Sequence, residues 1–254
     1  MKKLLAITAL SAALFFGQTA AAEEKAAEEV KPSHVEMVLV LDESGSMSNL
    51  TNDTIGGFNS MIEKEKKLDV DAHVTTVLFN DQYKMLYNRR ELKDVRKMTD
   101  KDYTPGGMTA LLDAVGRTIP KMDMVSGIHR KDKGNKVLFV IITDGEENDS
   151  REYTYADVKK LIKDRQENAG WEFIFLGANI DAVAAAENLG IDGDRAVKYK
   201  NTGSGVRANF KAVAELSDSL AKSGRVSDEW KETVEKDEDD AVDKQSAAVT
   251  LHRR

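Results

Sequence analysis

The sequence of 254 residues contains no cysteine. Disulfide bonds, thiolate metal ligands, a cysteine nucleophile and membrane attachment through a lipidated cysteine are therefore excluded. The stability of the protein must come from packing. A hydrophobic content of 41% over this length is sufficient for one sizeable core.

Long hydrophobic runs are also missing. The run at residues 4–16, about thirteen residues, is shorter than the roughly 20 residues that a membrane-spanning helix needs. It follows Lys2 and Lys3 and precedes three alanines ending at Ala22, the order of basic, apolar and small residues that is typical of a secretory signal peptide. We expect residues 1–22 to be such a signal, with cleavage near Ala22. The mature protein would have no membrane span and would be periplasmic or secreted.

Positive charge is not in excess. Thirty-seven Lys and Arg against 44 Asp and Glu give a net charge of −7, which becomes −9 once Lys2 and Lys3 leave with the signal. This acidity argues against binding to the phosphate backbone of nucleic acid. Motifs of metalloproteases, α/β-hydrolases and P-loop enzymes are missing as well, so we do not expect an enzyme. The four scattered histidines are expected to be structural or exposed: His34, His73, His129 and His252.

Short apolar runs alternate with helical patterns along the chain. The runs are nearly continuously hydrophobic, which is typical of strands buried on both faces; they lie at 34–41, 72–80, 136–143 and 172–178. Between them, apolar residues recur every three or four positions, which predicts helices near 55–62, 112–122, 155–162, 182–189 and 210–220. This alternation predicts an α/β fold: an open, mostly parallel sheet with helices on both faces.

One further run, YKMLYN at residues 83–88, follows the second predicted strand after only Asp81 and Gln82. Such a connection is too short for a crossover between parallel strands. We therefore expect it to form one antiparallel strand at the edge of the sheet.

The composition divides the chain into four parts. Residues 23–33 are charged and poor in large apolar groups, as expected of a solvated linker after the signal. Residues 34–224 carry the strand and helix patterns of one domain. From 225 to 254 the apolar content is too low for good packing, and we expect a charged, flexible or loosely helical tail, with a functional acidic arm as the alternative.

Oxygen-bearing side chains follow three of the predicted elements. Asp42, Ser44 and Ser46 come directly after the first strand, Asp144 comes after the third buried strand, and Thr109 stands at a glycine-rich entry to the second helix. The carboxyl ends of parallel strands meet at one edge of a sheet, where ligands bind. Carboxylates and hydroxyls suit a hard divalent cation such as Mg²⁺. A polar turn that caps a helix would explain the first loop alone, but three such loops in register favour a metal site.

The remaining loop residues are expected to support the site. Glycines would let two of the loops bend: Gly45, Gly106 and Gly107. Three acids are expected to be exposed rather than ligands: Glu43, Glu146 and Glu147. Asp113 either supports the Thr109 loop or is an ordinary acid at a helix start.

The segments DESGSM, PGGMTAL and ITDGEEN, in this order and on these elements, resemble the von Willebrand factor A (vWA) domain with its metal-ion-dependent adhesion site. The resemblance covers about residues 34–220 and implies a Rossmann-like fold. FLGANIDAVAAAENLGI resembles stand-alone bacterial members of the family, many of which are cytoplasmic, so the expected signal peptide departs from them.

The resemblance also implies roles for the five residues. Ser44 and Ser46 would bind Mg²⁺ or Mn²⁺ directly, Asp42 and Asp144 would hold it largely through water, and Thr109 would do either. The sixth position would take a carboxylate from a protein partner. The protein would then be an exported binding module in adhesion, scaffolding or complex assembly.

Two other functions stay open at the level of sequence. One is a Mg²⁺-dependent phosphohydrolase with Asp42 as nucleophile, because an acid after the first strand beside a metal resembles a phosphoaspartate site. Ser44 stands where its second acid would be, however, and no motif places a catalytic lysine. The other is a metal-independent assembly subunit with a vestigial site, although a complete set of five oxygen donors argues against decay.

Overall fold

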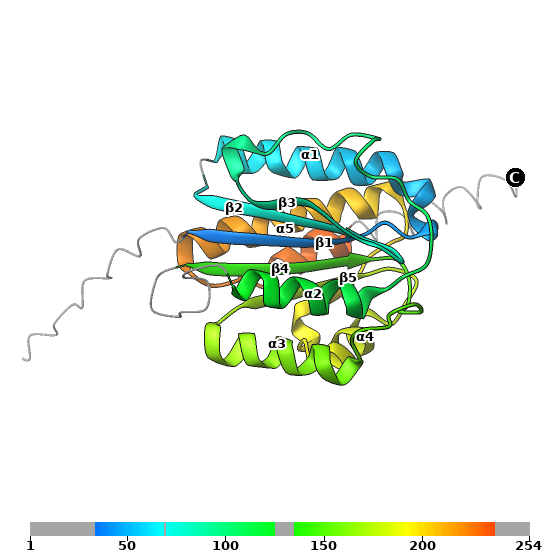
Figure 1. Ribbon diagram of the computed structural model, residues 1–254. Coiled ribbons are helices and arrows are strands. Elements are labelled where there is room, and N and C mark those ends of the chain that lie inside the picture. Colours follow the sequence, from blue (N-terminus) through cyan, green and yellow to red (C-terminus); the bar gives the residue numbers. More distant parts are fainter. Residues whose placement is uncertain (1–33, 69, 125–134, 237–254) are drawn as a thin grey trace, which may run out of the picture.

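The computed structural model describes residues 34–68, 70–124 and 135–236, and its elements follow the predicted alternation (Figure 1). The strands are β1 (Val35–Asp42), β2 (Ala72–Phe79), β3 (Tyr83–Glu91), β4 (Lys136–Thr143), β5 (Glu172–Gly177) and β6 (Ala196–Lys198). The helices are α1 (Thr51–Lys67), α2 (Leu111–Asp123), α3 (Tyr155–Ala169), α4 (Ala182–Leu189) and α5 (Gly203–Ser223). Short 3₁₀ turns are η1 (Gly45–Leu50), η2 (Leu92–Asp94) and η4 (Gly193–Arg195).

The strands form one six-stranded sheet in the order β3-β2-β1-β4-β5-β6. Only β3 is antiparallel to its neighbour β2, as its short connection predicts. The expected fold class is thereby confirmed: an open, mostly parallel, Rossmann-like sheet with one antiparallel edge strand. Sequence analysis missed β6, a strand of three residues on the opposite edge.

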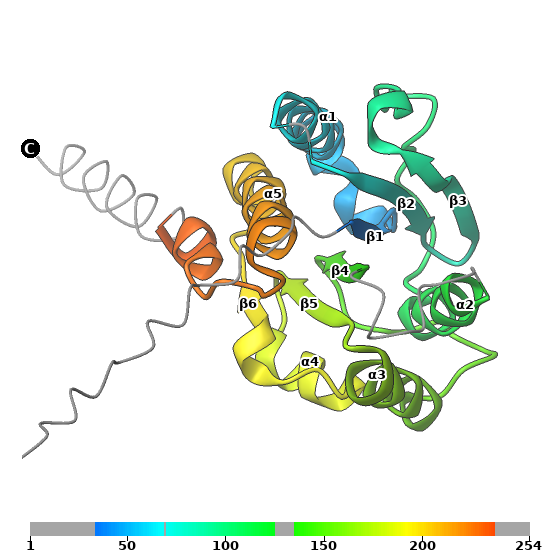
Figure 2. The same cartoon turned by 90° about the vertical axis from the view of Figure 1, so that its left-hand side faces the viewer.

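Helices cover both faces of the sheet. Figure 2 shows α1 and α5 on one side and α2, α3 and α4 on the other. All eight residues of β1 are buried, and they alternate between the two layers. Met37 and Leu39 belong to the core cluster under α1 and α5, whereas Val38 and Val40 belong to the cluster under α2 and α3. Burial on both faces explains the continuous hydrophobicity of the strands.

The helix ends carry the signals that the sequence contains. Thr154 and Asp157 form a capping box at the start of α3, with each side chain bonded to the other's backbone N–H. Asp181 caps α4, which ends at Gly190 in the left-handed conformation. These caps fix where α3 and α4 begin relative to the strands that precede them.

The chain continues to pack after α5. Trp230 and Val234 are buried in the core cluster that includes α1 and α5, in contrast to the expected poor packing of this segment. The division of the chain at residue 225 stays a prediction. The expected signal peptide, the linker and the end of the tail, residues 237–254, lie outside the described residues. Within the described part, no helix has both the length and the apolar character needed to cross a bilayer.

A buried acid lies between α1 and α5. Glu65 is 0% exposed; its Oε2 accepts a hydrogen bond from Ser217 Oγ at 2.7 Å, and its Oε1 has no hydrogen-bond partner within the described residues. Burial, with a smaller effect of the nearby Asp218, raises the pKa of Glu65 from 4.5 to about 7. The folded protein therefore holds this proton more tightly than the unfolded chain does.

This raised pKa predicts a loss of stability on ionisation. The contribution of Glu65 to the free energy of unfolding is fully present below pH 4.5. It is lost as pH rises through 7, because between these two values the side chain ionises in the unfolded chain but stays protonated in the folded one. Between pH 5 and pH 8 we expect Glu65 to lower the free energy of unfolding by about 2–3 kcal/mol. Urea unfolding at both pH values measures this decrease in the free energy of unfolding, and Glu65→Gln should lack the part that comes from Glu65. Glu63→Gln, on the same helix, should retain it; equal pH dependence in wild type and Glu65→Gln would contradict the assignment.

Candidate metal centre

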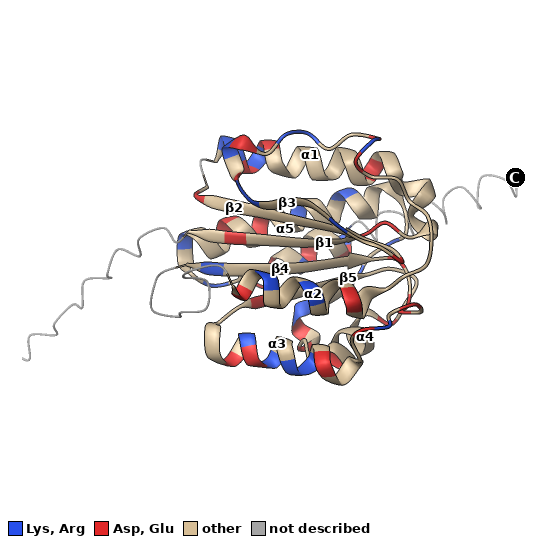
Figure 3. Ribbon diagram, viewed as in Figure 1, with Lys and Arg blue, Asp and Glu red and all other residues tan. Residues whose placement is uncertain are grey.

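The predicted ligands lie where the strand order reverses. From β1 the chain continues to β2 on one side of the sheet and later returns to β4 on the other side. At such a point of an open sheet, a crevice is expected between the connecting loops. Asp42 is the last residue of β1, and Asp144 directly follows β4. In Figure 3 the loops at the right-hand end of the strands carry acidic segments.

The first loop is built around the buried carboxylate of Asp42. Ser44 N donates to Asp42 Oδ1 at 2.7 Å, and Thr143 Oγ1, from the end of β4, donates to Asp42 Oδ2 at 2.6 Å. The chain then turns into η1, where Ser44 Oγ and Ser46 Oγ lie 3.0 Å apart. The two serine hydroxyls are therefore neighbours, as the spacing in the sequence predicts.

Asp144 joins this pair from the second loop. Ser46 Oγ donates to Asp144 Oδ1 at 2.5 Å, across 98 residues of sequence. Asn201 Nδ2 donates to Asp144 Oδ2 at 3.3 Å and so holds the other carboxylate oxygen. The loops after β1 and β4 thus meet through side chains that the sequence marks as ligands.

Thr109 faces the same point from the third loop. A Cβ built on Gly145 would lie 3.7 Å from Thr109 Oγ1 and 3.9 Å from Ser46 Oγ, so the two hydroxyls flank one small region. Asn148 holds the Thr109 backbone: its Oδ1 accepts from Thr109 N at 2.9 Å, and its own N donates to Thr109 O at 3.0 Å. The loop that carries Asp144 therefore also places Thr109.

The arrangement fits a small divalent cation. Bonds of 2.0–2.1 Å in an octahedron place neighbouring ligand atoms about 2.9 Å apart, and the two serine hydroxyls are separated by 3.0 Å. The pKa of Asp42 is raised by burial and by the negative charge of Asp144, although hydrogen bonds from Thr143 and Ser44 oppose the shift. The two negative charges that face each other here would also attract a cation. The Tyr199 hydroxyl is buried beside them without a hydrogen-bond partner among the described residues.

Of the three glycines, only Gly107 is required by its backbone. Its φ of +76° lies in the left-handed region, and a Cβ there would lie 2.0 Å from Asp81 Oδ1. Gly45 N donates to Gly107 O at 3.2 Å, which ties the serine loop to the Thr109 loop. Gly45 and Gly106 themselves have ordinary φ angles.

The acidic residues around the site differ in part from the expected exposure and contacts. Glu43 is 5% exposed, so the expectation of an exposed acid is wrong; its Oε1 accepts from Thr104 N and forms an ion pair with Lys84. Glu147 is half-buried and accepts from Leu112 N at the start of α2, and only Glu146 is exposed as expected. Asp113 accepts backbone bonds from residues 151–153 and so fixes the second loop rather than contacting Thr109.

Sequence reasoning missed Thr143 and Asn148, which bind and orient the predicted ligands. Both stand inside the segment ITDGEEN; Thr143 directly precedes Asp144, and Asn148 follows it by four residues. Their roles depend on which loop faces which, and that is set by the order of the strands. A polar residue ending a buried strand, as Thr143 does, was the one available signal.

An open, mostly parallel α/β sheet with helices on both faces and loops that converge where the strand order reverses defines the Rossmann-like class of domains. The vWA-TerF-like family model, described as a vWA domain found in the C terminus of TerF, matches residues 34–197. The chain therefore belongs to this family. No curated protein has a matching sequence.

Solved structures with a similar fold include a PilB minor pilin from Streptococcus sanguinis, with 12% identity and a TM-score of 0.54 over 73% of this chain and 61% of the pilin. The vWF domain of the type V pili tip protein Mfa5 from Porphyromonas gingivalis has 12% identity and a TM-score of 0.53 over 78% and 99%. Proximal thread matrix protein 1 of the mussel byssus, with a zinc-occupied MIDAS motif, has 13% identity and a TM-score of 0.50 over 72% and 45%. The chain thus spans less than two thirds of the pilin, and these identities establish the fold alone.

The predicted metal site can be tested through the Asn148 side chain that holds Thr109. Asn148→Ala leaves all five predicted ligands in place but removes the acceptor for Thr109 N. We expect Mn²⁺ affinity, measured by isothermal titration calorimetry, to fall by roughly 10- to 100-fold, as is typical when a residue that orients a ligand is lost. Glu146→Gln, an exposed change in the same loop, should leave the affinity unchanged. Equal affinities of Asn148→Ala and wild type would contradict this role.

Proposed function

We propose that this protein is an exported binding module that uses Mg²⁺ or Mn²⁺ to bind an acidic residue of a protein partner. The observation that carries the proposal is the convergence of hydroxyl and carboxylate oxygens from three loops, centred on the Ser46–Asp144 contact of 2.5 Å. The metal, when bound, would offer a positive charge with one coordination position open to a partner carboxylate.

The burial of each predicted ligand indicates how it would contact the metal. Both oxygens of the buried Asp42 accept hydrogen bonds within the protein, so Asp42 suits a role through water and does not neutralise the ion directly. Ser44 and Ser46 supply neutral oxygens. Because Ser46 is exposed, the side of the site that it borders is open to solvent and to a partner. A cation held mainly by neutral ligands retains affinity for an anionic oxygen.

The proposed location and process are supported by the sequence and by the similarity of fold. The basic, apolar and small residues at 1–22 support export to the periplasm or outside the cell. Similarity of fold to a pilin, to a pili tip protein and to a protein with a zinc-occupied MIDAS motif supports a role in adhesion or assembly that includes a metal. The acidic chain also favours a protein partner over nucleic acid.

The phosphohydrolase alternative is disfavoured by the position of Asp42. A nucleophilic carboxylate needs an oxygen free to attack. Asp42 is 1% exposed, and both of its oxygens accept hydrogen bonds within the protein. A metal-independent assembly role is opposed by the convergence of hydroxyl and carboxylate oxygens from three loops, which suits metal coordination.

Partner binding should depend on the metal. Wild-type protein immobilised and exposed to native envelope extract in Mg²⁺ should retain a partner that is released by chelator and restored by added Mn²⁺. Asp42→Ala should retain much less of it, since loss of the buried carboxylate frees both Ser44 N and Thr143 Oγ1.

Calorimetry with the purified partner gives the decisive comparison. We expect its affinity to fall at least about tenfold in excess chelator, because metal and partner share one coordination shell. Glu146→Gln serves as the control variant. An affinity that is unchanged by chelator and by Asp42→Ala would overturn the proposal.

A further inference from the structure

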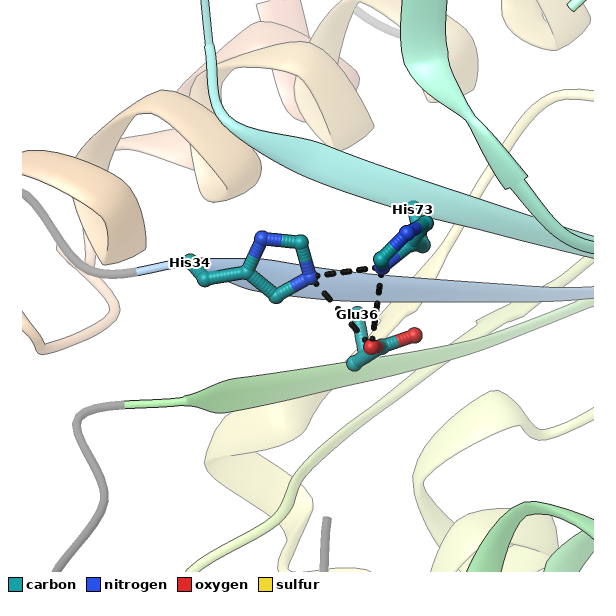
Figure 4. Close-up of side chains that lie close together, drawn as sticks. All are labelled: His34, Glu36 and His73. Carbon is teal, nitrogen blue, oxygen red and sulfur yellow. Dashed lines mark hydrogen bonds and ion pairs between the residues drawn. The ribbon is translucent and has the colours of Figure 1, made fainter. Parts of the chain in front are cut away.

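A second cluster of ligand-type side chains lies at the opposite end of the sheet. Glu36 is the second residue of β1 and pairs in register with His73 of β2, while His34 directly precedes β1. Figure 4 shows the three side chains pointing toward one another. Within the described residues, these are the only three His, Cys, Asp or Glu side chains whose ligand atoms all lie within 4.8 Å of one another.

The three ligand atoms have the separations of a metal shell. His34 Nε2 lies 2.8 Å from His73 Nδ1 and 3.3 Å from Glu36 Oε1, and His73 Nδ1 lies 3.2 Å from Glu36 Oε1. Zinc bonds of 2.0–2.1 Å in a tetrahedron place neighbouring ligands about 3.3 Å apart. A shift of about half an ångström between the two rings therefore completes this geometry.

Asp71 can orient His34 for coordination. Asp71 Oδ1 lies 3.0 Å from His34 Nδ1, so an Nδ1–H would donate to it. A metal would then replace any proton on Nε2, the nitrogen that faces Glu36 and His73. A carboxylate that orients a histidine in this way is the usual outer partner of a metal-binding imidazole.

The Glu36 carboxylate also has a cationic partner, Arg89. Arg89 Nε donates to Glu36 Oε2 at 3.0 Å, and its Nη2 also reaches Oε1. With Arg89 kept on Oε2, Oε1 can turn to a metal. The guanidinium is the competitor, because a metal must displace its Nη2 from Oε1 and from His73 Nδ1, which lies 3.3 Å away.

The cluster is open to solvent on one side. The side chains of His34 and His73 are 18% and 26% exposed, and both line a surface hollow with Asp71 and Glu91. Three protein ligands with access from solvent leave a fourth position for water or for a small exogenous ligand. Two imidazoles and one carboxylate favour Zn²⁺ over Mg²⁺, which prefers oxygen ligands alone.

We propose that His34 Nε2, His73 Nδ1 and Glu36 Oε1 form a second metal site, for Zn²⁺ or a similar transition-metal dication, separate from the oxygen-donor centre. Asp71 is a positioning residue that acts through His34. The bound ion links the segment before β1 to the start of β2, so it stabilises the folded chain.

The test is a zinc titration of the full chain against a chromophoric chelator, with excess Mg²⁺ present to occupy the first centre. We expect zinc affinity to fall at least about tenfold in His34→Gln and in His73→Gln, and by roughly 10- to 100-fold in Asp71→Asn. Asp42→Ala, which alters the first centre, and Glu91→Gln, in the same hollow, should bind zinc as wild type does. Loss of zinc binding in Asp42→Ala with retention in the histidine variants would overturn the proposal.

Cobalt substitution supplies a readout that a purely structural cluster would not give. Co²⁺ in wild type should show the strong visible absorption of tetrahedral coordination, and this absorption should be lost in His73→Gln but kept at higher Co²⁺ in Asp71→Asn. Zinc should also raise the thermal midpoint of Arg89→Gln more than that of wild type, since the competing cation is gone. If wild type shows neither this absorption nor any zinc affinity, the proposal of a second site is wrong, whereas the proposal for the first centre is unaffected.

Discussion

The buried carboxylate of Asp42 is the interaction on which the oxygen-donor end of the molecule depends. One of its oxygens binds the backbone of the serine loop, and the other binds Thr143 at the end of β4. An ionised group that is 1% exposed is costly unless it is paired or fully hydrogen-bonded. The two bonds therefore fix the turn after β1 against the neighbouring strand, and the positions of Ser44 and Ser46 follow from that turn.

Much of this could be predicted because the determinants are local. The continuous apolar runs locate β1, β2, β4 and β5, and the short connection before Tyr83 identifies β3 as antiparallel. By contrast, β6 has only three residues and lacks a periodic signal. The Asn148 clamp on Thr109 depends on two loops 39 residues apart, and no local pattern reports such a pairing.

The histidine cluster also could not be predicted from a local sequence pattern. His34 and His73 have no motif spacing, and sequence reasoning treated them as unrelated. They meet because β1 and β2 are parallel neighbours whose register places Glu36 opposite His73. A shift of one residue would place the side chain opposite Glu36 on the other face of the sheet. The site thus depends on a register that hydrophobic burial enforces along the full length of β1.

The two ends of β1 carry different chemistry for a reason that the sheet itself supplies. Glu36 and Asp42 are six residues apart on one strand, which separates them by about 20 Å. At that distance, with a hydrophobic core between them, charges interact weakly and substitutions at one end should add to those at the other. The carboxyl end collects loop hydroxyls and carboxylates, which suit a hard cation. The amino end places two imidazoles beside one carboxylate, which suits a softer one. A single buried strand can therefore position both proposed sites, with their different metal preferences, because each depends on the neighbours of its own end and both depend on the same register.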